Sequence, residues 1–372
     1  MKVLILSCNT GQGHNSVSQA VQEAFEARGV PCRTADSLSF LSQRASSFIC
    51  GWHVRIYRYL PSAMRAGYRY TEGHPGVYDE KTLIYRFLAS GADRLWEFVQ
   101  EVGYDCFVCP HVISGLMLTR MLREHPLPGA KSCFIATDYT CGPLVNESAL
   151  DWYFTPDAAT VPDFAAAGIP AEKVVPVSGI PVRSAFYERV PQREARARLG
   201  LPETGRQVLM MGGSMGCGPL DELAQLLLGA LPEGCGITAV CGTNERLYKK
   251  LTRAFSGEPR LRVLGFTQEI PLLMDSADLF LTKPGGLSTS EAAVKGLPLV
   301  LDDVVSGCEE PNLRYFCACG GARTASAPQE LAALCASLLA DPETLAAMSR
   351  SLLRPGRAAD EIAERMLREQ AR

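Results

Sequence analysis

The sequence has few of the features that mark a membrane-spanning or secreted protein. Hydrophobic residues make up 47% of the 372 residues, yet no uncharged apolar stretch approaches the roughly 20 residues that a transmembrane helix needs. The apolar part of the N-terminal segment, residues 2–7, is also too short for the central region of a signal peptide. We therefore expect a cytoplasmic protein that can lie on a membrane but does not cross it.

An excess of charge of one sign is lacking as well. Charged residues make up 21% of the chain and the net charge is −3, an ordinary balance for a globular enzyme. A chain that binds nucleic acid over much of its surface carries a large positive excess. We therefore expect no nucleic-acid partner.

The cysteines lack the spacing of a metal site or a disulfide framework. There are fourteen, and the pair in Cys106-x-x-Cys109 has no second pair to complete a set of metal ligands. Many cysteines, such as Cys8, Cys133 and Cys241, lie inside apolar runs. We interpret them as small core residues in a reducing environment.

What the chain does have is one pattern that occurs twice. Residues 2–7 form an apolar strand, followed by the turn GQGHNS (11–16) and a helical pattern that ends at Gly29. The segment QVLMMGGSMGCGPLDELAQLLLGAL, from residue 207, repeats the order of strand, glycine turn and helix. Each is typical of the start of a doubly wound α/β domain, so the sequence predicts two such domains. Further apolar strands are expected at 105–110, 131–138, 151–156, 173–179, 236–242, 261–266, 277–283 and 298–303.

The boundary between the two halves is expected near residue 185. This predicts domains at residues 1–185 and 186–350, and a C-terminal helix in 351–372 that packs back on the first domain. Because no long polar linker separates the halves, we expect them to face a central cleft.

The first glycine turn carries a histidine. Its third glycine position is Ser16, and no evident second strand ends in an acidic residue at the ribose-binding distance, although Asp36 is the nearest candidate. A dinucleotide site is therefore disfavoured. His14 could simply make a hydrogen bond at the helix start, or its imidazole could take a proton from a hydroxyl nucleophile. The two glycines beside it favour the second interpretation.

Two later turns have the character of phosphate sites. MGGSMGCG (211–218) lacks the Lys-Ser/Thr ending of a P-loop, which favours a diphosphate over a triphosphate. In KPGGLSTSEAAVKGLPLVL (283–301), Ser288 is the expected N-cap of a helix whose first amides form an anion site. Glu291 has capping-box spacing from Ser288, but its carboxylate could instead hold both hydroxyls of a ribose. Together these turns predict a nucleotide-sugar site.

At these residues the chain resembles the family of plant monogalactosyldiacylglycerol synthases and bacterial processive diacylglycerol glucosyltransferases, which are relatives of the enzyme that makes lipid II. The turns GQGHNS and KPGGLSTSEAAVKGLPLVL are similar to the family's histidine turn and donor motif. Similar segments follow in order at 136–140, 178–183, 241–251 and 265–286, and the resemblance covers about residues 1–320. It implies a GT-B fold, an α/β architecture of two Rossmann-like domains with the donor nucleotide in the second.

The resemblance also implies roles for single residues. It puts the uracil beside Phe266, the diphosphate between the 212–214 and 285–289 turns, and the ribose on Glu291. The donor-binding residues it implies are Gly213, Ser214, Asn244, Phe266, Gly285, Gly286, Ser288, Thr289, Glu291, Glu309 and Asn312. On the acceptor side, His14 is the expected catalytic residue, accompanied by Gly11, Gly13, Asn15, His111 and Asp138.

The chain departs from the family pattern at a few positions. Cys308 replaces a glutamine that would face the sugar, which leaves the identity of the sugar open. Gly142 and Val145 replace a histidine and a tryptophan after the 136–140 segment, which leaves the acceptor chemistry open.

A basic and aromatic stretch completes the acceptor side. No acidic residue occurs from Ser37 to Thr71, where five arginines alternate with aromatic residues. The stretch could be a solvated helix pair, a nucleic-acid contact or a membrane-surface contact. The resemblance favours the membrane, and the predicted membrane contacts are Trp52, Arg55, Arg58 and Arg65.

The sequence therefore predicts an inverting, UDP-sugar-dependent hexosyltransferase that is peripherally associated with the membrane. UDP-glucose or UDP-galactose would be the donor and a lipid such as diacylglycerol the acceptor, with no cofactor and no metal, because no Asp-x-Asp cluster lies near the donor motif. Three alternatives stay open: transfer to another lipid or small molecule, a sugar-nucleotide epimerase marked by clustered carboxylates, and a non-catalytic nucleotide-sugar-binding protein.

Overall fold

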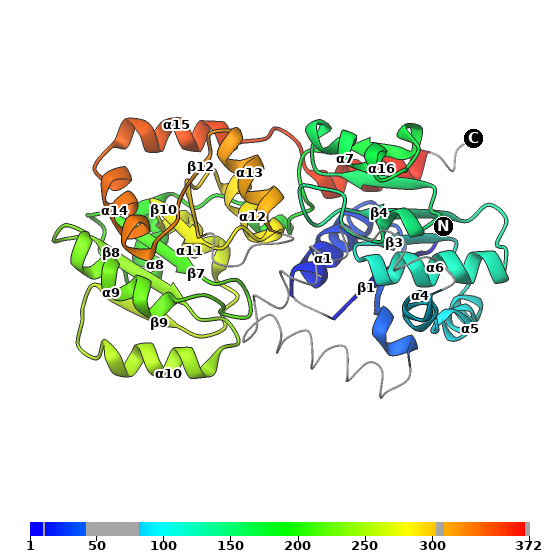
Figure 1. Ribbon diagram of the computed structural model, residues 1–372, viewed down its shortest axis with the longest axis horizontal. Helices are drawn as coiled ribbons and strands as arrows, with labels where there is room; N and C mark the ends of the chain where they lie inside the picture. The colour runs from blue at the N-terminus through cyan, green and yellow to red at the C-terminus, as the bar shows by residue number, and fades with distance from the viewer. Residues whose placement is uncertain (10–11, 42–81, 303–308, 369–372) are drawn as a thin grey trace. The chain divides into compact units, whose positions relative to one another are not determined.

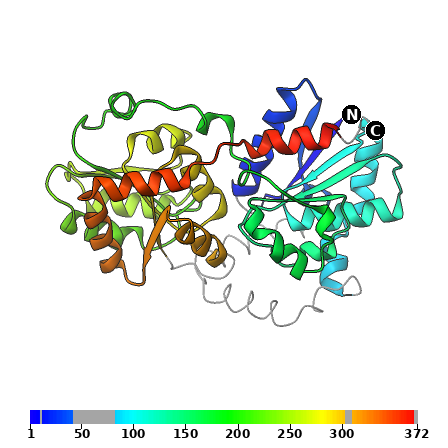
Figure 2. The same cartoon turned by 90° about the horizontal axis from the view of Figure 1, so that it is seen from above.

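The chain folds into two α/β units, each built on its own parallel sheet (Figures 1 and 2). The computed structural model describes residues 1–9, 12–41, 82–302 and 309–368. Unit 1 comprises Met1–Arg183 together with Pro355–Arg372, and unit 2 comprises Ser184–Arg354. The chain therefore passes from unit 1 to unit 2 and returns to unit 1 at its end.

Unit 1 has a six-stranded sheet in the order β2-β1-β3-β4-β5-β6. Every pairing is parallel, and the strands are β1 (Val3–Ser7), β2 (Cys32–Asp36), β3 (Cys106–Cys109), β4 (Lys131–Ile135), β5 (Trp152–Thr155) and β6 (Val174–Pro176). The helices are α1 (Gln12–Glu26), α4 (Leu83–Leu88), α5 (Ala92–Val102), α6 (Val112–Glu124), α7 (Val161–Ala166) and α16 (Ala358–Arg368). Since β1 and β3 are buried along their whole length, they read as unbroken apolar runs.

The helix α16 belongs to unit 1 although it follows unit 2 in the sequence. It packs against α1, and both views show it on that helix's unit (Figures 1 and 2). Arg28, just after α1, pairs with Asp360 at 2.6 Å and with Glu364 at 3.0 Å. The hydrogen bond that Arg28 donates to Asp360 raises the pKa of Arg28. A further bond joins the Ser178 amide to Glu361 at 2.9 Å.

Unit 2 has a second six-stranded parallel sheet, in the order β12-β11-β10-β7-β8-β9. Its strands are β7 (Gln207–Met211), β8 (Gly236–Val240), β9 (Leu261–Leu264), β10 (Leu279–Thr282), β11 (Leu299–Asp302) and β12 (Ala322–Ala325). Its helices are α8 (Gln192–Leu199), α9 (Leu220–Ala230), α10 (Glu245–Ala254), α11 (Ile270–Ser276), α12 (Gly286–Lys295), α13 (Glu310–Ala318), α14 (Pro328–Leu339) and α15 (Pro342–Leu352). Each unit has its own large cluster of buried apolar residues.

The strands expected from apolar runs are all present, and two further strands had no such signal. β2 and β12 are the outer strands of their sheets, and most of their residues are partly or fully exposed. An outer strand is covered less than an inner one, so it needs no apolar run. The expectation that no second strand ends in an acidic residue is wrong, because β2 ends at Asp36.

Among the described helices, no single one has both the length and the apolar composition of a membrane span. The pair α14 and α15 passes that test only when taken together, and it is bent by 99° at its break. Leu331, Cys335 and Met348 of this pair are buried in the unit 2 core, so core packing accounts for its apolar residues.

The twelve cysteines within the described ranges are free thiols, and most of them are buried. Burial raises the pKa of Cys106 to about 12 and raises that of Cys109 even further. The interpretation of this CxxC pair as core residues is therefore confirmed.

Candidate functional site

Each unit has a point where its strand order reverses, and the candidate residues follow the strands that flank it. In unit 1, β2 lies on one side of β1, and β3 with all later strands lies on the other. In unit 2, β8 and β9 lie on one side of β7, while β10 to β12 lie on the other. Ligands of open α/β sheets bind at such switch points, beyond the carboxyl ends of the strands.

His14 lies in the first turn of α1, directly after β1. Its Nδ1 lies 2.9 Å from the carbonyl oxygen of Pro110, the residue that follows β3. A carbonyl can only accept, so Nδ1 carries the proton and donates it. In the neutral ring the basic lone pair is then on Nε2. The switch point thus fixes which nitrogen of His14 can take up a proton.

Another histidine of unit 1, His111, is the N-cap of α6 and lies beside His14. The two rings are in an edge-to-face arrangement with centroids 4.5 Å apart. The Ile113 amide donates to Nδ1 of His111 at 3.1 Å. Both histidines are half-buried. The sequence therefore identified two residues that the fold brings into contact although they lie 97 positions apart in the chain.

Polar residues around the His14 turn are joined by hydrogen bonds. Asn15 accepts from the Ser7 hydroxyl at 2.6 Å and donates to the Asn9 side chain at 3.1 Å. Asp36 accepts from the amides of Asn9 and Leu38 at 3.2 and 3.0 Å. Asn15 and Asp36 therefore hold the ends of β1 and β2 together, and Asp36 caps a turn here.

The other acceptor-side residues are placed less fully. Asp138 follows β4, at the same edge of the sheet as Pro110. Gly13 lies inside the first turn of α1, and a side chain there would meet nothing within 4 Å. Gly11, Trp52, Arg55, Arg58 and Arg65, together with Cys308, lie outside the described residues. Their expected roles stay predictions.

In unit 2 the 212–218 turn packs tightly on its neighbours. Gly216 has φ +58°, and a side chain there would overlap the backbone oxygen of Cys241. Gly213 has φ +69°, and its added Cβ would lie 2.8 Å from Cε of Lys283. At Gly216 the backbone leaves space for glycine alone, whereas at Gly213 it is the left-handed conformation that favours glycine, because the Lys283 side chain can move.

Asn244 holds this turn from the side. Its side-chain oxygen accepts from the Leu247 amide at 3.1 Å, which caps α10, and its amide donates to the Gly216 carbonyl at 2.9 Å. Asn244 was expected to bind the donor. These two bonds give it a structural part, in which it fixes the glycine turn, and its expected contact with the donor stays a prediction.

In the third glycine turn, 283–286, the helix α12 begins at Gly286. The N-cap is Gly285 and not Ser288, so the expected cap is wrong, as is the capping box with Glu291. Thr289 and Ser290 donate their hydroxyls back to Gly285 and Gly286, at 2.9 and 2.7 Å. The first intrahelical bond is from the Thr289 amide to Gly285, so the amides of 286–288 have no acceptor within the helix. That is the arrangement of an anion site.

Buried polar groups hold this turn in place. Lys283 forms an ion pair with Glu309, and the Asn312 amide donates to the Pro284 carbonyl at 2.9 Å. Glu291, Glu309 and Asn312 are all at most 6% exposed. Lys283 was not among the expected site residues, yet its side chain lies against both Gly213 and Gly285. Its position directly before Pro284 in the donor motif was the available signal.

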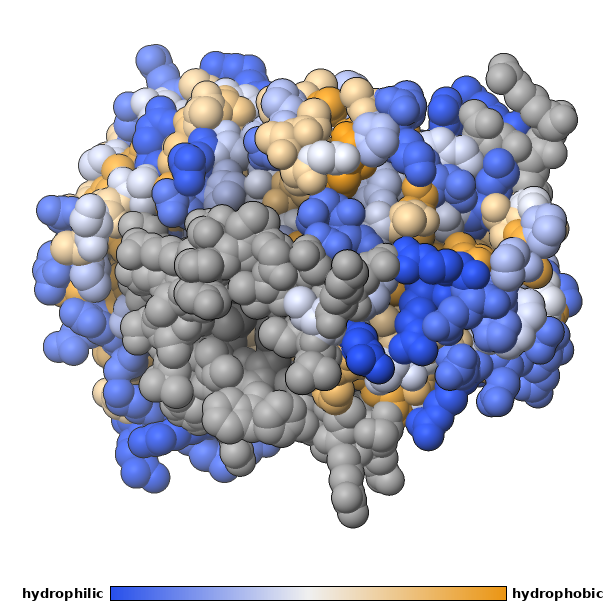
Figure 3. Space-filling view, turned by 45° about the vertical axis from the view of Figure 1, so that its right-hand side comes forward, coloured by the Kyte–Doolittle hydropathy of each residue, from blue (hydrophilic) through white to orange (hydrophobic). Residues whose placement is uncertain are grey.

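Phe266 follows β9 and is 61% exposed. It is the most accessible large apolar side chain of the described surface; the other exposed ones are Phe87, Tyr248 and Leu353, at 38–43%. On the face drawn in Figure 3, the hydrophobic areas are small and scattered among hydrophilic residues. An exposed ring at a strand end is suited to stack on a planar base.

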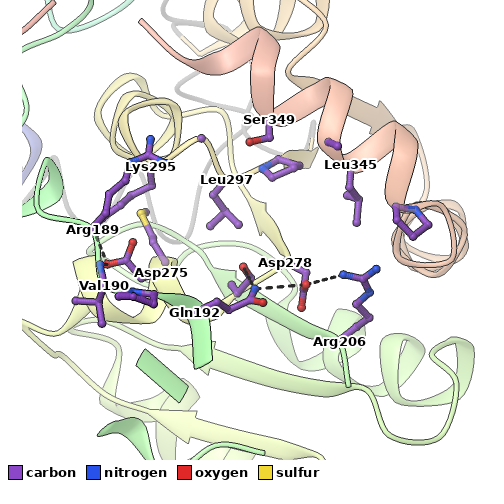
Figure 4. Close-up of a pocket in the computed structure, with 17 residues that line it drawn as sticks. Arg189, Val190, Gln192, Arg206, Asp275, Asp278, Lys295, Leu297, Leu345 and Ser349 are labelled. Atoms are coloured by element: carbon purple, nitrogen blue, oxygen red, sulfur yellow. Dashed lines mark hydrogen bonds and ion pairs between the residues drawn. The ribbon is translucent and has the colours of Figure 1, made fainter. Parts of the chain in front are cut away.

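A pocket of about 560 Å³ lies at the opposite edge of the unit 2 sheet (Figure 4). Its lining includes Arg206 and Asp278, which directly precede β7 and β10. Asp278 pairs with Arg196 at 2.7 Å and with Arg206 at 2.9 Å, and Lys295 pairs with Asp275 at 2.6 Å. Each of these charges is paired within the protein, so we assign them to tying the loops together.

One group within the described ranges has the spacing of metal ligands. Ligand atoms of Asp93, Glu124 and His125 lie within 4.8 Å of one another, and both carboxylates are exposed. The group lies at the C-terminal end of α6, whereas His111 begins that helix. It is therefore separate from the candidate site.

Two family matches divide the chain between them. Residues 14–182 match the monogalactosyldiacylglycerol (MGDG) synthase family, and residues 207–362 match the glycosyltransferase family 28 C-terminal domain. The first match lies in unit 1, and the second covers most of unit 2 and the start of α16.

Curated relatives agree with these matches. A probable chloroplastic MGDG synthase of Nicotiana tabacum is 27% identical over 385 residues, which cover 96% of this chain and 68% of that protein. A processive diacylglycerol β-glucosyltransferase of Staphylococcus saprophyticus is 25% identical over 357 residues, covering 94% of this chain and 88% of that protein.

Solved structures show the same fold at lower identity. Anabaena Alr3699/HepE in complex with UDP is 15% identical with a TM-score of 0.57, covering 100% of this chain and 98% of that one. The UDP-GlcNAc 2-epimerase of Neisseria meningitidis bound to UDP-GlcNAc is 13% identical with a TM-score of 0.64, covering 99% and 100%. The two six-stranded parallel sheets form the expected GT-B architecture. The chain therefore combines a region that matches the monogalactosyldiacylglycerol synthase family with one that matches the glycosyltransferase family 28 C-terminal domain, on a GT-B architecture.

Proposed function

We propose that the protein transfers a hexose from UDP-glucose or UDP-galactose to the hydroxyl of diacylglycerol or a closely related membrane lipid, with inversion at the anomeric carbon. The observation that carries the proposal is that each unit has, at its switch point, one of the two features that a transfer reaction needs. The switch point of unit 1 has a histidine with a defined basic nitrogen, and the switch point of unit 2 has a helix start whose first amides have no acceptor within the helix. A transfer reaction needs both an activated acceptor and a held donor.

The donor half follows from the turns of unit 2. The diphosphate would lie on the amides of 286–288 and the 212–214 turn, with the Lys283 ammonium nearby. Glu291, one turn further along α12, would accept both ribose hydroxyls, and Phe266 would stack on the uracil. Amides and an ammonium already in place stabilise the negative charge that develops on departing UDP.

The acceptor half follows from His14. Nε2 takes the proton of the lipid hydroxyl while that oxygen forms a bond to the anomeric carbon of the sugar. The bond from the anomeric carbon to the phosphate oxygen breaks at the same time, and UDP leaves with the bonding electrons. A single displacement from the opposite side inverts the anomeric configuration, and the Pro110 carbonyl stabilises the imidazolium through Nδ1–H.

The lipid acceptor requires that the protein reach a membrane surface. Trp52, Arg55, Arg58 and Arg65 are the residues we propose for this contact, on the grounds of their basic and aromatic character. Peripheral association through them stays a prediction.

The test is to incubate the protein with labelled UDP-glucose or UDP-galactose, with and without diacylglycerol liposomes. The proposal expects label in the lipid fraction only when diacylglycerol is present, and a β-linked product by NMR. An epimerase would instead convert the UDP-sugar without lipid, and a binding protein would do neither. As a matched control, His14→Gln should keep UDP affinity within about twofold while lowering turnover roughly 10²- to 10⁴-fold. A variant that keeps over half the turnover would remove His14 from the mechanism.

A further inference from the structure

The two adjacent imidazoles of unit 1 have opposite hydrogen-bonding characters. Nδ1 of His14 donates to a carbonyl, so its lone pair is on Nε2. Nδ1 of His111 accepts from an amide, so in the neutral ring its proton is on Nε2. One ring is therefore fixed with a basic nitrogen at Nε2, and the ring beside it is fixed with a donor at the same atom.

We propose that His111 remains neutral through the reaction and donates a hydrogen bond from Nε2 to a second oxygen of the acceptor lipid, next to the hydroxyl that His14 deprotonates. This inference rests on the proposed function, because it requires an alcohol as the acceptor. It gives His111 a part in acceptor binding that differs from its part as a helix cap.

The cap explains why His111 stays neutral. A second proton would have to bind Nδ1, where it would face the N–H of Ile113 and break the cap. The positive end of the α6 dipole also opposes an imidazolium at that place. His14 lies in the first turn of α1 and meets the same opposition from a helix dipole, but its Nδ1–H donates to the Pro110 carbonyl, which stabilises the charge that the ring gains during the reaction.

The charged groups at this edge of the sheet favour a single positive charge on the two histidines. Asp36 ends β2, and the amides of Asn9 and Leu38 hold its carboxylate. Asp138 follows β4, the neighbour of β3. Because carboxylates at the neighbouring strand ends favour one positive charge here, and two imidazolium rings 4.5 Å apart would repel each other, only one histidine of the pair should become charged.

The pair selects a chemical class of acceptor. A base and a donor side by side fit an alcohol that has another oxygen on the neighbouring carbon, such as the ester oxygen of a 1,2-diacylglycerol. A long-chain alcohol with a single oxygen can give its proton to His14, but it has no second oxygen to accept the hydrogen bond from His111. A site that hydrogen-bonds a substrate oxygen discriminates against analogues that lack it.

The direct test is the tautomer of each ring, read from long-range ¹H–¹⁵N spectra of the full-length protein labelled at its five histidines. His111→Asn and His14→Gln variants assign the two signals. We expect His111 as the Nε2–H tautomer, unchanged between pH 5.5 and 8, and His14 as the Nδ1–H tautomer when neutral. A His111 signal that titrates in this range, or that shows the Nδ1–H tautomer, overturns the proposal.

Two variants then separate binding from capping. Asparagine caps helices well, so His111→Asn keeps the cap while it removes the imidazole, whereas His111→Ala removes both. We expect both variants to lower kcat/KM for 1,2-diacylglycerol about tenfold, the usual effect of one lost hydrogen bond, and only the alanine variant to lower Tm. A His111→Asn protein as active as wild type would limit His111 to the cap and overturn the donor role.

The acceptor comparison completes the experiment. Wild type should use 1,2-diacylglycerol at least about tenfold better than a long-chain primary alcohol in the same micelles, and equal use would overturn the predicted acceptor class. If wild type transfers sugar to no lipid alcohol, the proposed function fails, whereas the spectra still decide the tautomers.

Discussion

At the scale of single residues, Glu291 is where the donor hypothesis can be tested most sharply. It is 6% exposed and lies on α12, one turn after the candidate phosphate site. If its carboxylate accepts two ribose hydroxyls, Glu291→Ala should weaken UDP binding by about 2–3 kcal/mol, or roughly 30- to 150-fold. Titration calorimetry measures this change.

A modified ligand provides the matched control for Glu291. Wild type should bind 2′,3′-dideoxy-UDP about as weakly as the variant binds UDP, and the variant should lose little more on the dideoxy ligand. Equal losses for both ligands would mean that Glu291 supports the helix and does not contact the ribose.

The buried cysteines predict how stability depends on pH. Burial raises the pKa of Cys106 and of Cys335 from 9.0 to about 12. The unfolded chain therefore releases these protons near pH 9, and the folded protein holds them until about pH 12. The contribution to the free energy of unfolding is complete below pH 9 and is lost between pH 9 and 12, by up to about 1.4 kcal/mol per pH unit for each thiol.

Urea unfolding at pH 8, 9 and 10 checks this slope. Cys335→Ala is the control, because it removes one buried thiol and should make the decline above pH 9 shallower. A Cys335→Ala protein with an unchanged slope would show that other groups cause the alkaline loss.

The residues around α12 show what the sequence could predict and what it could not. The donor motif placed Gly285, Gly286 and Thr289 at a helix start, and the structure has them there. The prediction of Ser288 as the N-cap was wrong. Serine is a common side-chain cap, but the helix begins after Gly285, which has no side chain to cap it. Lys283 was missed because its contact with Gly213 joins residues 70 positions apart, which no local pattern reports.

At the scale of secondary-structure elements, Asn244 links a helix to the 212–218 glycine turn. Its oxygen caps α10 and its amide holds Gly216. Asn244→Asp keeps the cap and loses the amide donor, whereas Asn244→Ala loses both. We expect the alanine variant to lower the free energy of unfolding by about 1–2 kcal/mol and the aspartate variant to change it much less.

UDP affinity should respond in a different pattern. Both Asn244 variants loosen the glycine turn, so both should weaken UDP binding by a similar, modest factor of about three to ten. A loss of affinity in the alanine variant alone would assign the effect to α10 and exclude the turn.

The elements also differ in how well they could be predicted. Inner strands such as β7 and β10 were predicted because both their faces are covered, which demands apolar residues. The outer strands β2 and β12 were not predicted, because a strand that is covered less can contain exposed polar residues such as Arg33 and Arg323 and so lacks an apolar run. The contact of His14 with His111 depends on sheet order, which helix and strand patterns do not contain.

At the scale of the whole molecule, the two units have separate cores. No residue of the unit 1 cluster belongs to the unit 2 cluster within the described ranges. We therefore predict two unfolding transitions by calorimetry. UDP at about 100 times its Kd should stabilise the transition of unit 2 by about 2.7 kcal/mol and leave the other unchanged.

A fragment assigns the two transitions. Residues 184–354 form a continuous unit, and the peak that such a fragment shares with the full chain is that of unit 2. A UDP shift of the other peak would move the donor site to unit 1.

The return of the chain to unit 1 also has a consequence for biosynthesis. Arg28 and its helix α1 emerge from the ribosome early, but their partners on α16 are translated only after the whole of unit 2. Unit 2 is complete in the nascent chain while α16 is still to be made, and domains generally fold as units during synthesis. The nascent protein should therefore complete unit 2 first. Unit 1 gains its last helix only after unit 2 has been made, so the order of translation itself would delay the unit that carries His14.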